Sequence, residues 1–95
     1  MLDQAKALMK MKKLQKELAQ TIIEVDAGDG AVVVRINGEQ KIKGVSIDPD
    51  SIDLEDIEQL ESWVQEAFKK AVEESQKIAQ EKMKPMLGNL GNLGL

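Results

Sequence analysis

The 95-residue chain contains no cysteine and no histidine. Without cysteine there is no disulfide framework and no thiolate metal site, and without histidine the commonest general base and metal ligand is missing. A membrane-spanning helix needs about 18 consecutive apolar residues, and no apolar run in this chain is that long. The first residues also lack the apolar region of a signal peptide. We therefore expect a cytoplasmic protein with no membrane partner, cofactor or small-molecule substrate.

Aromatic residues are also scarce, with one tryptophan, one phenylalanine and no tyrosine. A chain this short buries only a modest share of its surface. A core of aliphatic residues and methionine with so few large rings is thin for a monomer. The composition therefore favours a homodimer.

The middle of the chain has the pattern of a β-meander. Residues 28–30 predict a turn and residues 31–36 a strand. Asn37-Gly38 predicts a two-residue hairpin turn, because both residues tolerate positive φ. Residues 40–47 return as a strand, which Asp48-Pro49 ends because proline has no N–H group for the ladder.

A helix is predicted on either side of this meander. In residues 2–20, four apolar residues recur with helical spacing: Ala7, Met11, Leu14 and Leu18. Residues 21–27 predict a first strand. A second helix is expected to start after an Asp53 cap and to end at Lys84, before Pro85. The prediction is an α+β fold, helix–three antiparallel strands–long helix, as one domain over residues 1–87 with a flexible tail at 88–95.

The third strand leaves two alternatives, because Ile42 has the opposite parity from Val45 and Ile47. In one, Gly44 forms a bulge that restores the alternation. In the other, Ile22, Val33 and Ile42 form a second, weaker apolar face of the sheet. Through that face two copies would pair, so these three residues are the predicted dimer interface.

Charge is unevenly distributed around a net value of −4. The acidic balance argues against nucleic acid, yet residues 6–16 hold five lysines and no acid, whereas residues 48–61 hold seven acids and no base. On the second helix lysines have local partners, such as Glu66 for Lys70. The first helix has more lysine than it can pair, even with Lys13 next to Glu17. This excess is either a solvated face or a footprint for a polyanion.

Other chemistry finds little support in the sequence. The acidic segment DPDSIDLEDIE has Asp53 where an EF-hand needs glycine. The AGDG segment lies between strands and opens no helix, so it is not a phosphate loop. The hydroxyl residues have no histidine to activate them, and Trp63 is expected to pack against the sheet rim or a dimer seam. We therefore expect no catalytic residue and no metal site.

The order of these segments resembles the YbaB/EbfC family of bacterial nucleoid-associated proteins. The resemblance rests on LMKMKKLQKEL, AGDGAVVVRING, VSIDP and the helix LEDIEQLESWVQEAFKKAVEESQKIAQEKM; the family usually has glycine where Asp29 stands. It implies a homodimer joined through the sheets, with projecting helical arms that grip double-stranded DNA with low or modest sequence specificity. It also implies a place in the nucleoid and a role in nucleoid organisation or gene expression.

Carried onto this sequence, the resemblance implies that DNA contacts lie on the two helices. The residues concerned are Lys6, Lys10, Lys12, Lys13 and Lys16 on the first helix, and Lys77, Lys82 and Lys84 on the second. The alternative is a dimeric protein-interaction or scaffold module with no direct DNA binding. In that case the acidic second helix would meet a basic partner.

Overall fold

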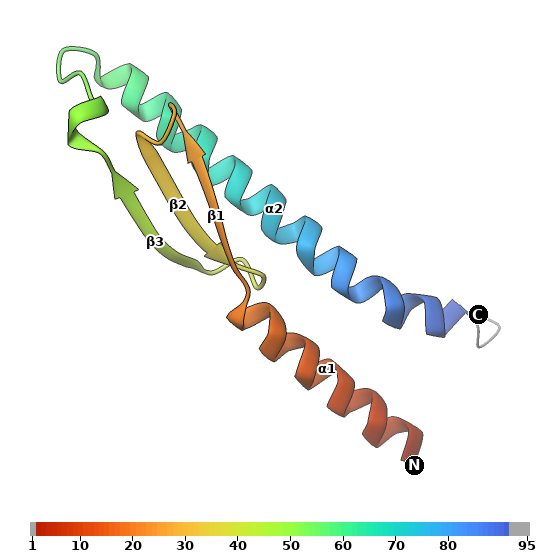
Figure 1. Ribbon diagram of the computed structural model, residues 1–95. Coiled ribbons are helices and arrows are strands. Elements are labelled where there is room, and N and C mark those ends of the chain that lie inside the picture. Colours follow the sequence, from red (N-terminus) through yellow and green to blue (C-terminus); the bar gives the residue numbers. More distant parts are fainter. Residues whose placement is uncertain (1, 92–95) are drawn as a thin grey trace.

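The computed structural model describes residues 2–91, with side chains from residue 3 to residue 85, and confirms the α+β fold (Figure 1). The elements, in chain order, are helix α1 (Leu2–Gln20), strands β1 (Ile22–Ala27), β2 (Val32–Asn37) and β3 (Ile42–Ile47), the short 3-10 helix η1 (Pro49–Ser51) and helix α2 (Ile57–Gly91). The molecule is elongated and measures 63 × 22 × 15 Å.

The three strands form an antiparallel sheet in the order β1-β2-β3, and α2 lies across one face of it (Figure 1). Val34 in the central strand pairs with Val25 on one side and Val45 on the other. The buried core joins this sheet face to α2, and its members are Ala27, Val32, Val34, Ile36, Ala67 and Ala71. Because α2 packs on β1 and β2, β3 extends beyond the helix. Its apolar residues Ile42, Val45 and Ile47 remain 45%, 44% and 45% exposed.

The predicted irregularity at Gly44 is confirmed. Arg35 pairs with Gly44 and the next residue, Ile36, pairs with Ile42, so one residue of β3 is bulged out. Gly44 has a second role, since a Cβ atom there would lie 2.5 Å from the Arg35 Nη2 atom. The bulge places Ile42 on the same sheet face as Ile36. The alternative in which Ile42 shares a second face with Ile22 and Val33 is therefore wrong.

The first hairpin turn is confirmed at residues 28–30. Gly28, Asp29 and Gly30 all have positive φ, at 64°, 53° and 89°, and the Ala31 N–H group donates to the Gly28 carbonyl at 3.2 Å. Asp29 tolerates this conformation better than most residues with a Cβ atom. Trp63 packs against the core and its ring lies so close to Gly28 that a Cβ atom there would be 2.6 Å from it, as expected for packing at the sheet rim.

The second hairpin differs from the prediction. Asn37 remains in β2, Gly38 does not have positive φ, and the left-handed residue is Gln40, with φ 65°. The Asn37 N–H group donates to the Lys41 carbonyl at 2.9 Å, which closes a three-residue loop. The two-residue Asn37-Gly38 turn is wrong because both residues are used in contacts with α1, described below.

Both predicted ends of the second helix are also wrong. The Asp53 side chain accepts from the Glu55 N–H group, in a turn before the helix. Asp56 is the cap instead, because its Oδ1 atom accepts from the Gln59 N–H group at 3.3 Å. At the other end α2 continues through Pro85 to Gly91. Residues 81–85 are exposed, so water can reach the carbonyl that Pro85 leaves without an N–H donor. Of the predicted tail, residues 88–91 are helical and residues 92–95 lie outside the described part.

Candidate nucleic-acid interface

Helix α1 projects from the sheet as an arm and is held only near its C-terminal end (Figure 1). Along its apolar stripe Leu18 is buried, at 8% exposed, and Leu14 is half-buried. Further out, Met11 is 48% and Leu8 is 55% exposed. The stripe predicted from the sequence is therefore buried only where the helix meets the sheet.

The attachment of α1 uses the carbonyl groups that every helix leaves free at its C-terminus. The Gly38 N–H group donates to the Leu18 carbonyl at 2.8 Å, and the Asn37 Nδ2 atom donates to the Ala19 carbonyl at 3.2 Å. A Cβ atom on residue 38 would lie 2.9 Å from the Leu18 oxygen. Glycine at residue 38 therefore permits the close approach of the hairpin to α1.

Helix α2 joins the same attachment through Ser75. The Ser75 Oγ atom donates to the Asn37 carbonyl at 2.7 Å and accepts from the Gln40 N–H group at 3.2 Å. Asn37 and Ser75 are 1% and 0% exposed, and the Asn37 Oδ1 atom accepts from the N–H groups of Glu39 and Lys41 at 2.9 and 3.0 Å. We call Asn37, Gly38 and Ser75 the arm joint, because they fix α1 relative to α2.

The sequence reasoning missed the arm joint. It took Asn37-Gly38 as a turn and assigned no role to Ser75. A usable signal was present, because Ala67, Ala71 and Ser75 recur at every fourth position and mark a helix face of small residues. Such a face is where a strand or hairpin approaches a helix closely.

The predicted lysines all lie on the two arms, which extend toward the same side of the sheet (Figure 1). Each of them is exposed: Lys6, Lys10, Lys12, Lys13 and Lys16 on α1, and Lys77, Lys82 and Lys84 on α2. Within the described side chains, the five lysines of α1 form no ion pair. Glu17 pairs with Lys82 of α2, Nζ to Oε2 3.9 Å, and not with Lys13 as expected. An exposed pair at this distance contributes little to stability.

Two further cations stand at the base of the α1 arm. Lys41 and Lys43 are exposed and follow the hairpin loop whose Gly38 contacts Leu18. They are not among the predicted contact residues, because the resemblance placed the DNA contacts on the two helices. Their place beside the arm depends on the contact between the hairpin and α1, which joins residues far apart in the sequence.

The opposite end of the molecule is acidic. Seven exposed acids lie between the end of β3 and the first turns of α2: Asp48, Asp50, Asp53, Glu55, Asp56, Glu58 and Glu61. Several serve as caps; Asp48, for example, accepts from the Asp50 N–H group and the Ser51 hydroxyl. Among the described residues, no three acids are grouped to hold a metal ion. No helix of residues 2–91 is long and apolar enough to cross a membrane.

Comparison with known proteins shows the family of the chain. Residues 1–90 match the YbaB/EbfC DNA-binding family. The chain belongs to the YbaB/EbfC family. A nucleoid-associated protein of Chloroflexus aurantiacus is 39% identical over 83 residues, which cover 87% of this chain and 83% of the relative.

Other known proteins extend the similarity along nearly the whole chain. A nucleoid-associated protein of Syntrophobacter fumaroxidans is 38% identical over 95 residues, covering 99% of this chain and 86% of the relative. The crystal structure of an uncharacterized protein from Helicobacter pylori superposes with a TM-score of 0.66 at 26% identity, over 94% of this chain and 87% of that chain. The chain is thus similar to nucleoid-associated proteins in sequence and to the Helicobacter pylori protein in fold. The matched family is described by DNA binding and not by a reaction.

Proposed function

We propose that this YbaB/EbfC protein is a nucleoid-associated protein that binds duplex DNA as a homodimer, with the lysines of its helical arms on the phosphates. The observation that carries the proposal is the α1 arm. Its five lysines are exposed and form no ion pair among the described side chains. Their charge is therefore available to displace counterions from DNA. The nucleoid is the location that follows from such binding.

The chemistry of the arms favours low or modest sequence specificity. Lysine is a point charge that suits phosphate, whereas the planar fork of arginine suits bidentate reading of guanine. The single arginine, Arg35, lies across Gly44 in the sheet and not on an arm. Contacts would follow the DNA backbone. Any effect on nucleoid organisation or gene expression would then depend on how much of the DNA the protein covers and on the shape of that DNA.

Dimerisation through the sheets has support in the uncovered part of β3. Ile42, Val45 and Ile47 lie on the face that carries the core, yet α2 does not reach them. A second copy laid against this row would remove apolar surface from water. Ile22, at 53% exposed, and Val33 occupy the opposite face next to charged residues. The dimer interface proposed here therefore keeps Ile42 and adds Val45 and Ile47.

The dimer is tested by light scattering after size-exclusion chromatography. Val45→Asp should shift the protein toward monomer, because an unpaired carboxylate would be buried in the seam. Ile22→Asp, a matched change on the other face, should leave the dimer intact. A dimer that survives the first change and is lost with the second would move the seam to the opposite face.

DNA binding is tested by fluorescence anisotropy of a labelled duplex, titrated from low to physiological salt. Each phosphate contact contributes about −0.9 to the slope of log affinity against log salt concentration. A variant with Lys10, Lys12, Lys13 and Lys16 changed to glutamine should lose most of that slope and most of the affinity. Lys69→Gln, a control on α2 over the sheet, should lose little.

The outcomes separate the two candidate functions. Wild-type protein that does not bind the duplex even at low salt would leave the alternative, a protein-interaction module whose arms grip another protein. Binding that is unchanged in the four-lysine variant would show that the α1 lysines are not the contact residues.

A further inference from the structure

Strand β1 is an edge strand, and the hydrogen bonds of the sheet define which of its main-chain groups face outward. The Asp48 N–H group donates to the Ala31 carbonyl and the Asn37 N–H group to the Lys41 carbonyl. Main-chain groups alternate in direction along a strand, so Val32, Val34 and Ile36 direct theirs to β1. Their partners there are Ala27, Val25 and Ile23. The intervening residues of β1 therefore point their N–H and C=O groups away from the sheet.

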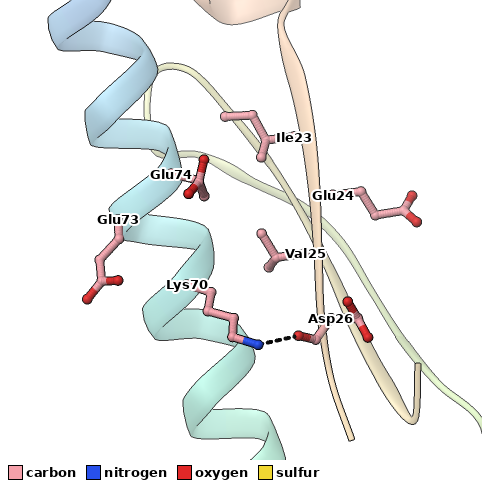
Figure 2. Close-up of a pocket in the computed structure, with 7 residues that line it drawn as sticks. All are labelled: Ile23, Glu24, Val25, Asp26, Lys70, Glu73 and Glu74. Atoms are coloured by element: carbon pink, nitrogen blue, oxygen red, sulfur yellow. Dashed lines mark hydrogen bonds between the residues drawn. The ribbon is translucent and has the colours of Figure 1, made fainter. Parts of the chain in front are cut away.

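One contact at this edge agrees with that assignment. The Lys70 Nζ atom donates to the Asp26 carbonyl at 3.1 Å, from the side of α2 (Figure 2). Apart from bonds between the strands themselves, no hydrogen bond among the described residues occupies the N–H and C=O groups of Ile22 and Glu24 or the N–H group of Asp26. The edge is thus capped at one carbonyl and open along the rest.

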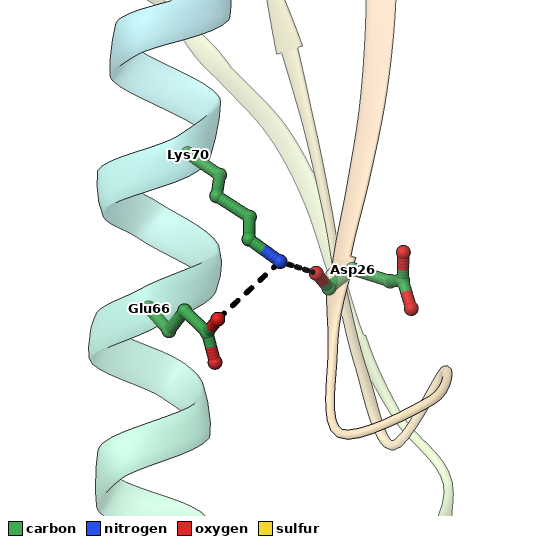
Figure 3. A network of polar contacts seen from close by, with 3 residues as sticks. All are labelled: Asp26, Glu66 and Lys70. Atoms are coloured by element: carbon green, nitrogen blue, oxygen red, sulfur yellow. Dashed lines mark hydrogen bonds and ion pairs between the residues drawn. The ribbon is translucent and has the colours of Figure 1, made fainter.

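A groove of about 440 Å³ runs between this edge and α2. Ile23 and Val25 point into it from β1, whereas Glu73 and Glu74 lie along its other side on α2 (Figure 2). Glu24 and Asp26 alternate with the two apolar residues along β1, and their carboxylates point away from α2, on the opposite face of the same edge (Figure 2). The single cation, Lys70, also pairs with Glu66 at 3.4 Å, as the helical spacing predicted (Figure 3). Acidic side chains therefore lie on both faces of the β1 edge.

We propose that the open edge of β1 binds an extended, lysine- or arginine-rich peptide segment as a fourth strand of the sheet. An added strand takes its affinity from main-chain hydrogen bonds and its selectivity from alternate side chains. Here the free N–H and C=O groups supply the first. The acids on the two faces of the edge, Glu73 and Glu74 on one and Glu24 and Asp26 on the other, favour basic side chains. This site lies apart from the lysines of the α1 arm, so it is a surface additional to the proposed DNA interface.

A second copy of this chain fits the edge less well than a basic peptide. Two β1 strands paired side by side would bring acidic side chains of Glu24 and Asp26 into the same narrow strip. Like charges on facing strands are destabilising. Charge therefore selects the partner and keeps the edge from pairing with itself.

The test uses a fluorescein-labelled, acetylated and amidated eight-residue peptide of alternating lysine and valine, with a glutamate–valine peptide as the charge control. Anisotropy is measured at physiological salt with the full-length protein. The lysine peptide should bind and the glutamate peptide should not. Absence of binding by the lysine peptide, or equal binding of both, would overturn the proposal.

Two variants at one position separate strand addition from simple charge attraction. Glu24→Pro removes an outward N–H group without taking a hydrogen bond from the sheet, because proline is tolerated at such edge positions. It should weaken peptide binding at least tenfold, whereas Glu24→Gln should weaken it only a few-fold. DNA binding should be the same in both. Equal peptide binding by the two variants would show that the edge hydrogen bonds are not used.

Amide hydrogen exchange gives an answer that needs no variant. In wild-type protein saturated with the lysine peptide, the amide protons of Glu24 and Asp26 should exchange more slowly than in free protein. Those of residues 69–74 on α2 should change little. Unchanged exchange at Glu24 and Asp26 would refute the fourth strand even if the peptide binds.

Discussion

Replacement of Asn37 by alanine tests the arm joint. Asn37 is 1% exposed, and its side chain makes three hydrogen bonds: Nδ2 to the Ala19 carbonyl, and Oδ1 from the N–H groups of Glu39 and Lys41. One bond holds α1 and two hold the hairpin loop. Asn37→Ala removes all three, whereas Asn37→Asp keeps the two acceptor bonds and removes only the donor to α1.

The size of the effect follows from the number of bonds. A protein hydrogen bond contributes about 1 kcal/mol net, so three bonds give about 3 kcal/mol for Asn37→Ala. Glu39 and Lys41 are exposed, and water can reach their N–H groups, so no large additional cost of unpaired donors is expected. Asn37→Asp should cost more than the about 1 kcal/mol of the lost bond, because it also sets a buried carboxylate against the Ala19 carbonyl.

The assay is urea denaturation followed by circular dichroism, at one protein concentration because dimer stability depends on it. Equal slopes against urea would allow the midpoints to be compared directly. Amide NMR shifts near Leu18 should move in both variants, and shifts in the hairpin loop only in Asn37→Ala. A loss below about 1 kcal/mol in Asn37→Ala, or identical spectra for the two variants, would refute the reasoning.

Three more predictions follow from glycine geometry and from the pair between the arms. Gly28→Ala should lower the free energy of unfolding by about 2–3 kcal/mol and shift Trp63 fluorescence, because the indole is 2.6 Å from the new Cβ position. The control Gly30→Ala has open space around the new Cβ atom, so it should lower the free energy of unfolding by about 1 kcal/mol and leave the fluorescence unchanged. Gly38→Ala should cost about 1–3 kcal/mol in urea denaturation and shift the Leu18 amide resonance. Glu17→Gln should raise affinity for duplex DNA a few-fold at low salt, since it releases Lys82; unchanged affinity would separate Lys82 from the DNA interface.

Much of the fold was predictable because it depends on periodicity. Helix α1 was placed at its observed bounds, and the three strands within one or two residues. The bulge at Gly44 was also predictable, because Ile42 breaks the alternation and glycine marks the break. These features are local, and each is visible in the spacing of apolar residues.

The errors occurred where one residue type has several possible uses. Asn37-Gly38 has the composition of a tight turn, but the pair is used for a tertiary contact, which local sequence does not reveal. Asp53 and Asp56 are both suitable caps, and only the path of the chain after η1 selects between them. Pro85 is usually a helix terminator, yet the exposed end of α2 tolerates it. In the candidate site the lysines were recognised by charge, whereas Ser75 was not, because a buried hydroxyl has no signature without its partner.

The separation of charge along the 63 Å length of the molecule gives it a large electric dipole. Near a polyanion the net charge of −4 per chain gives weak repulsion at a distance, but the field of the polyanion exerts a torque on the dipole that turns the basic arms toward it. The acidic ends would then face the solvent, so DNA coated with this protein would present a negative outer layer. Two coated segments would repel one another, and at low salt we expect coated DNA to be separated and not condensed.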